Sequence, residues 1–153
     1  LDGIGVNSPF LVIDEDTDSN QSLPPPTDGG DASLVRDFNL KNKTPGKLLK
    51  EKLVPFLPKG QRFEILSAEA RGRLFSSDAE NRDGWDKFRR NYPFASGIVD
   101  FSRVGFNEQR TRAVVFVRNQ AHYTIGVGYI VYLQKSDATG KWSMTGSQLA
   151  YMS

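Results

Sequence analysis

The sequence predicts an α+β domain in which N-terminal helices pack on one face of a curved antiparallel sheet. Two observations support this class. The last part of the chain is rich in β-branched and aromatic side chains, most densely over 111–118. The segments between these runs are too short for crossover helices, so neighbouring strands must be antiparallel. A C-terminal four-strand meander is therefore expected, with strands over 98–106, 111–118, 123–135 and 141–152.

Two helices are expected ahead of this meander. Thr44 is a capping residue and Pro45 suits the first helical position, so one helix is expected to begin there and to end before Pro55. Ser77 and Glu80 form a capping box, which predicts a second helix over 78–91. The stretch 63–66 between them fits either an extended or a helical conformation.

The second helix carries large aromatic residues on one face. Trp85, Phe88 and Tyr92 recur at helical spacing, which predicts that they belong to the core rather than to a cofactor site. On the third expected strand, Gly126 and Gly128 share one face and leave it flat, so either a large group packs there or the strand bends there. The aromatic face of this helix is the expected occupant.

The N-terminal segment differs from the rest in composition and charge. Residues 1–33 are expected to form an acidic, Pro- and Gly-rich linker, and residues 34–153 a single α+β domain. The apolar run 10–13 fits either a strand or an anchor for this tail. The first forty residues carry a net charge of −7 and the remainder +9, so the segment either stays solvated or folds over a basic face. Because this composition is typical of a tether, it slightly favours an exported protein.

Composition excludes several classes of function. The chain of 153 residues has no Cys and one His, which excludes a disulfide scaffold, a thiolate zinc site and any multi-His metal site. No apolar run is long enough to span a membrane, and no dinucleotide-, phosphate- or zinc-binding motif is present. The start of a calcium loop is resembled by Asp14, Asp16, Asp18 and Asn20, but Ser19 and Pro25 replace the glycine and glutamate that such a loop needs. We expect no metal and no cofactor.

A ligand site, if present, is expected to draw its polar groups from Asp100, Arg103, Tyr92 and Tyr129. Arg103 lies between aromatic residues and fits two roles. It can grip a ligand inside a concave sheet, or pair with Asp100 or Glu108 and hold a turn.

The remaining polar residues give weaker signals. His122 is expected in an exposed hairpin loop, without the carboxylate and nucleophile that catalysis would need. The C-terminal part is basic, but its aromatic residues are required by the core, which argues against a nucleic-acid surface.

The last seventy or so residues resemble a group of uncharacterised predicted proteins. The shared pattern reads W..F...YP.S.G....SRVGFN and then G.GY...L.K..G.W, and here it covers 85–153, with SRVGFN at 102–107 as its most specific part. The resemblance implies a domain and no activity. Such sequences often carry two cysteines four residues apart, where this chain has Ala121 and Ile125. In fold alone, the order of helices and sheet is shared by nuclear-transport-factor-2-like and cystatin-like cones, which implies no function.

Two functions remain open from the sequence. The first is a small binding or interaction domain without evident catalytic machinery, whose partner is a protein or a small molecule. The alternative is a small-molecule enzyme or ligand-binding protein that uses a sheet pocket. The open edges of a meander also leave room for a homodimer.

Overall fold

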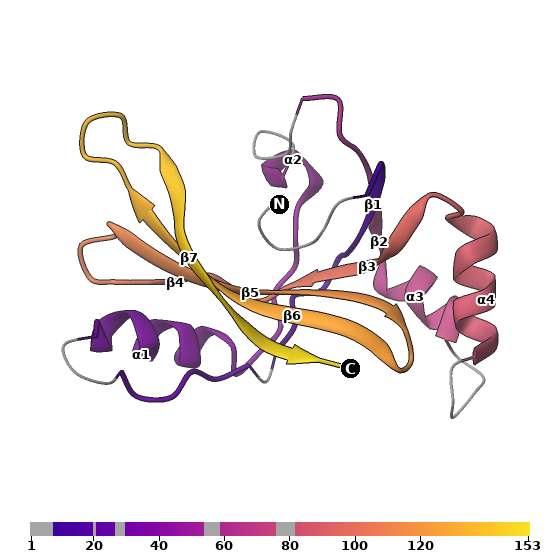
Figure 1. Ribbon diagram of the computed structural model, residues 1–153, viewed down its shortest axis with the longest axis horizontal. Coiled ribbons are helices and arrows are strands. Elements are labelled where there is room, and N and C mark those ends of the chain that lie inside the picture. The colour runs from indigo at the N-terminus through magenta and orange to yellow at the C-terminus, as the bar shows by residue number, and fades with distance from the viewer. Residues whose placement is uncertain (1–7, 20, 27–29, 54–58, 76–81) are drawn as a thin grey trace.

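The computed structural model describes residues 8–19, 21–26, 30–53, 59–75 and 82–153, and shows a mostly antiparallel, open seven-stranded sheet flanked by helices (Figure 1). The strand order is β2-β1-β3-β5-β6-β7, with β4 paired to β5. The α+β class and the antiparallel character of most of the sheet are thus confirmed. The elements are β1 (Phe10–Asp14), α1 (Ala32–Lys41), α2 (Lys50–Leu53), β2 (Arg62–Leu66), α3 (Ala68–Phe75), α4 (Arg82–Asn91), β3 (Ala95–Phe101), β4 (Gly105–Phe106), β5 (Arg112–His122), β6 (Ile125–Lys135) and β7 (Trp142–Met152).

The run 10–13 belongs to a central strand. β1 lies between β2 and β3 and is parallel to both. Leu11, Val12 and Ile13 are at most 2 % exposed, because a strand covered on both faces is apolar at every position. The chain order therefore differs from the expected one, since β1 precedes the helices and β2 lies among them.

The antiparallel part of the sheet follows the expected meander with one change. β3, β5, β6 and β7 pair in sequence with antiparallel registers. The first expected strand is split into β3 and β4. At this break the Ser102 N–H donates to the Phe116 carbonyl at 2.9 Å, and the Ser102 hydroxyl accepts from the Phe116 N–H at 2.8 Å.

The helix α1 is one that the sequence analysis did not predict. Asp31 caps it by accepting hydrogen bonds from the Ser33 and Leu34 N–H groups. Its buried residues Leu34 and Phe38 pack against β5 and β6. Gly105 allows this contact, because a Cβ at that position would lie 2.5 Å from the Cβ of Phe38.

The remaining helices only partly match expectation. The helix expected from Thr44 begins only at Lys50, and α3 was not predicted. The α4 helix lies within the range expected for the second helix, whereas Ser77 and Glu80 lie outside the described residues. No described helix has the length and apolar composition needed to cross a membrane.

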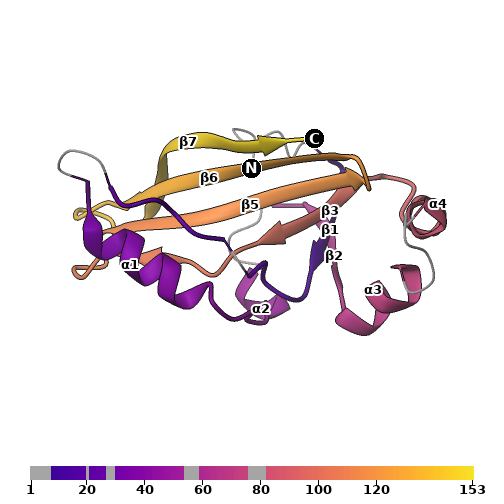
Figure 2. The same cartoon turned by 90° about the horizontal axis from the view of Figure 1, so that it is seen from below.

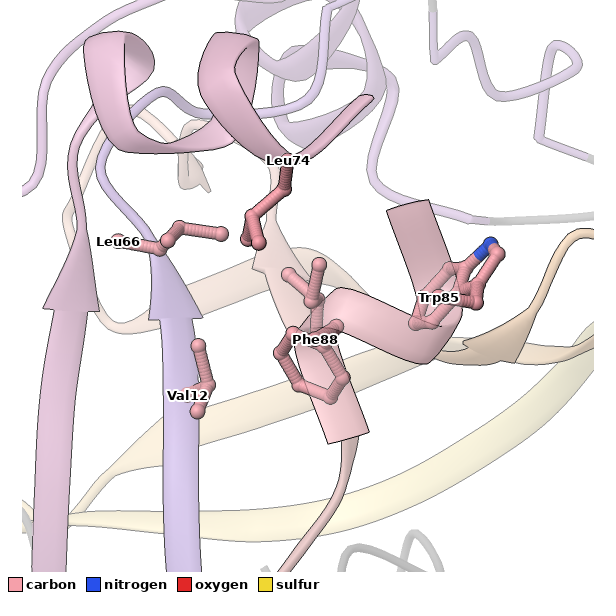
Figure 3. Packing of buried hydrophobic residues seen from close by; sticks show 6 residues of the cluster. Val12, Leu66, Leu74, Trp85 and Phe88 are labelled. Carbon is pink, nitrogen blue, oxygen red and sulfur yellow. The ribbon is translucent and has the colours of Figure 1, made fainter. Parts of the chain in front are cut away.

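Two aromatic residues of α4 lie in the core, as expected. Trp85 is 3 % exposed and Phe88 is 1 % exposed, and both pack with Val12, Leu66 and Leu74 (Figure 3). Tyr92 is only half-buried at the edge of this cluster. In Figures 1 and 2, α3 and α4 lie at one end of the molecule and α1 lies beneath β5 and β6 at the other.

The flat patch at the glycine pair is filled by β7 and β5. A Cβ on Gly128 would lie 2.5 Å from Tyr151 and 2.8 Å from Phe116, whose rings stack with centroids 6.3 Å apart. The occupant is therefore an aromatic residue of the neighbouring strand, and the expectation that the aromatic helix packs there is wrong. The reason is that Trp85 and Phe88 are already buried against β1 and β3.

Candidate functional site

The largest described pocket lies beside the carboxyl ends of the parallel strands. β1 ends at Asp14, β2 at Leu66 and β3 at Phe101, so the carboxyl ends of these three parallel strands lie together. Parallel sheets commonly bind ligands at the carboxyl ends of their strands. The pocket has a volume of about 540 Å³, within the range of small-molecule sites. It is lined by Asp14, Asp16, Thr17, Asp18, Ser19, Pro45, Ala68, Arg71, Gly72, Phe75, Asp100 and Arg118, and we call it the charged pocket.

The centre of the charged pocket is a buried carboxylate. Asp100 on β3 is 3 % exposed and faces Arg118 on β5 in the strand register. Its Oδ2 accepts a hydrogen bond from the Arg118 Nε at 3.0 Å, and its Oδ1 accepts one from the Arg71 Nη1 at 3.2 Å. The two guanidinium groups satisfy both oxygens of a carboxylate that would be costly to bury alone.

Both arginines extend this arrangement outward. Arg71 of α3 also pairs with Asp14 at the end of β1. Arg118 also pairs with Asp18, with 3.4 Å between its Nη1 and the Asp18 Oδ2. The order Asp14, Arg71, Asp100, Arg118, Asp18 is a line of alternating charges, which we call the charge chain. It connects β1, α3, β3, β5 and the segment that follows β1.

Burial sets the electrostatics at one end of the charge chain. Burial raises the pKa of Asp18, against the opposing effect of the Arg118 charge. Burial acts to lower the pKa of Arg118, but the carboxylates of Asp100 and Asp18 outweigh it and leave that pKa raised. Burial likewise raises the pKa of Tyr151, whose hydroxyl is near Arg118.

One carboxylate of the charged pocket, that of Asp16, has no partner among the residues that the structure describes. The Asp16 side chain makes no hydrogen bond or ion pair with any residue that the structure describes. Its backbone is nevertheless fixed, because the Thr17 N–H donates to the Gly46 carbonyl at 2.8 Å and the Leu48 N–H to the Glu15 carbonyl at 2.8 Å. Asp16 therefore offers an acceptor on an anchored backbone.

Of the four expected site residues, Asp100 alone lines the charged pocket. Arg103 connects instead to the end of α1. Its Nη1 donates to the Lys41 carbonyl at 3.2 Å, and its N–H donates to the Asn42 Oδ1 at 2.8 Å. The pairing with Asp100 or Glu108, one of the two roles considered for Arg103, is not found among the described residues, because the guanidinium donates to the carbonyl of the last residue of α1.

The other expected residues lie elsewhere. Tyr92 lines a separate surface pocket, where its hydroxyl donates to the Glu64 Oε1 at 2.9 Å. Burial, together with that hydrogen bond and the charge of Glu64, raises the pKa of Tyr92 to about 12. Tyr129 packs against a core cluster that includes Leu11 and Ile13. His122 ends β5, with its Nδ1 3.4 Å from the Thr124 hydroxyl, and does not line the charged pocket.

Sequence reasoning missed Arg71, Arg118 and the role of Asp14. Two signals were available for them. Asp14 directly follows an unbroken apolar run, and Arg118 directly follows the apolar run 113–117. A charge at either place needs a partner when the strand is buried. No comparable signal marks Arg71, which lies on a short helix with alternating polar residues.

The charged pocket does not have the geometry of a metal centre. Within the described ranges, no three His, Cys, Asp or Glu side chains are grouped closely enough to hold a metal ion.

Comparison with known proteins identifies no relative, since no family model, curated protein or solved structure matches the chain.

Proposed function

We propose that the protein is a small binding domain whose charged pocket receives a ligand with a positively charged group. The observation that carries this proposal is the balance of charge in the pocket. Its lining contains four carboxylates and two guanidinium groups, so it has an excess of two negative charges when all are ionised. A pocket with walls of one net sign concentrates ligands of the opposite sign.

The charge chain supports binding because it is organised before a ligand arrives. Asp14 and Asp100 are buried and paired, and they are attached to central strands of the sheet. A ligand would therefore meet fixed charges, and little conformational freedom would be lost on binding.

The residues that line the charged pocket also indicate the chemistry of the ligand. Phe75 and Pro45 add apolar surface to a lining that also contains the acceptors of Asp14, Asp16 and Asp18. A primary amine or guanidinium on a short aliphatic chain matches both, and Asp16 is the carboxylate free to receive it. Such a group occurs in small molecules and in the basic side chains of proteins.

An enzyme that uses the same pocket is the second candidate. It is favoured by the raised pKa of Asp18, which burial causes, because carboxyl groups with raised pKa values are typical of acid–base catalysis. Under this alternative, Asp18→Asn would abolish turnover and retain binding. The likeness to cone-shaped folds remains a prediction on which neither candidate depends.

Calorimetric titration with agmatine, which carries a guanidinium and an amine, tests the proposal. We expect the wild-type protein to bind agmatine and not succinate. We expect Asp16→Asn to weaken agmatine binding about tenfold, equivalent to about 1.4 kcal/mol. Asp137→Asn is the matched control, because it removes a carboxylate from an exposed turn far from the pocket. Equal affinity for agmatine and succinate, or equal loss in both variants, would contradict the proposal.

A further inference from the structure

The outer strand β7 differs from every other strand in its exposure. All of its eleven residues except Gly146 are exposed, and the strand contains no charged residue. It is the last strand in the sheet order, with β6 as its neighbour on one side. No described strand pairs with its other side, so backbone N–H and C=O groups are open there, which is the usual template for pairing with a further strand.

Exposed apolar side chains accompany this open edge. Leu149 is 51 % exposed, Met144 49 % and Met152 76 %. The opposite edge of the sheet is different, because β2 is only five residues long and carries exposed Arg62 and Glu64. A short edge strand with charged side chains resists pairing with other chains. β7 is neither short nor charged.

We propose that β7 pairs antiparallel with β7 of a second copy of this chain, across a twofold axis. The distribution of charge favours this occupant. The chain has a net charge of only +2, so two copies repel each other weakly. Because β7 has no charges, a copy of itself meets no like charge along the strand, and a twofold axis makes such a contact self-complementary.

Charges at one end of the strand select the antiparallel direction. Lys135 and Lys141 flank the start of β7, where Lys135 pairs with Trp142. A parallel arrangement would place these lysines beside their copies. An antiparallel pair of eleven-residue strands in full register separates the two groups by roughly 30 Å, well beyond the screening length at physiological salt.

Sedimentation velocity over a range of protein concentrations tests the proposal. We expect the wild-type protein to reach twice its mass of 17.1 kDa, and Leu149→Lys to remain at the monomer mass. Leu40→Lys makes the same substitution at a 63 % exposed leucine on α1, and this control should stay dimeric. A monomeric wild-type protein, or a dimeric Leu149→Lys variant, overturns the proposal.

Hydrogen exchange on the wild-type protein gives a result that does not depend on a variant folding. We expect the amides of β7 to exchange more slowly as the protein concentration rises, while those of β2 do not change. Exchange of β7 that is independent of concentration, or protection that rises at β2 instead, overturns the proposal. Either outcome leaves agmatine binding unaffected, so the pocket and the edge are tested separately.

Discussion

Asp100 and Arg118 face each other across β3 and β5, and the carboxylate Oδ2 accepts a hydrogen bond from the guanidinium Nε at 3.0 Å. This cross-strand pair is the middle of the charge chain. It places a buried carboxylate where the parallel strands end, while Asp16 in the same pocket is a carboxylate that no described residue pairs with.

Removing Arg118 should destabilise the fold strongly. The Arg118→Met variant leaves Asp18 without its cation and Asp100 with one of its two, so we expect a loss of about 3 kcal/mol in the free energy of unfolding, measured in urea. Arg112→Met is the matched control on the same strand, at an exposed position, and should change stability by less than about 0.5 kcal/mol. Equal losses in the two variants would mean that the charge chain does not stabilise the fold.

Adding a methyl group at Gly128 should also destabilise the protein. The new Cβ would overlap the rings of Tyr151 and Phe116, and we expect a loss of about 2 kcal/mol from overpacking. At Gly146 on the neighbouring strand nothing lies within 4 Å of the same position, so Gly146→Ala should be nearly neutral. Thermal unfolding of both variants checks the difference. A nearly neutral Gly128→Ala would show that the rings do not pack as described.

Acid should selectively weaken the contact at Asp37. Although burial acts to raise its pKa, hydrogen bonds from the Lys41 ammonium and the Phe106 N–H lower it below the usual value. The stabilisation is therefore present above the unfolded-state pKa, near 3.8, and is lost as the pH falls through the lower folded-state value. We expect Asp37→Asn to be less stable than wild type at pH 6, with the difference shrinking toward pH 2. A difference that does not change with pH would refute this account.

A titration to alkaline pH should detect the raised pKa of Tyr92. Because its pKa is raised to about 12 from 10, its contribution to stability is complete below pH 10 and is lost as the pH rises toward 12. In a titration followed by absorbance at 295 nm, we expect Tyr92→Phe to remove a late step among the five tyrosines. Loss of an early step instead would contradict the hydrogen bond to Glu64.

The sequence was informative where local patterns determine the structure. The meander follows from dense β-branched residues and short connections, and the burial of Trp85 and Phe88 follows from their helical spacing. The α1 helix was missed because only Leu34 and Phe38 are buried along it, which is too weak a pattern to detect. The charged pocket was missed for a different reason. Its arginines lie 47 residues apart, at Arg71 and Arg118, and only the parallel pairing of β1 with β3 brings their carboxylates together.

The most direct test of the central claim is an NMR titration of the ¹⁵N-labelled protein with agmatine. The account predicts that amide shifts concentrate at residues 14–18, at Arg71 and Gly72, and at Asp100 and Arg118, and that Asp16→Asn weakens them. Shifts spread evenly over the exposed carboxylates of the surface, or no shifts at the charged pocket, would contradict it.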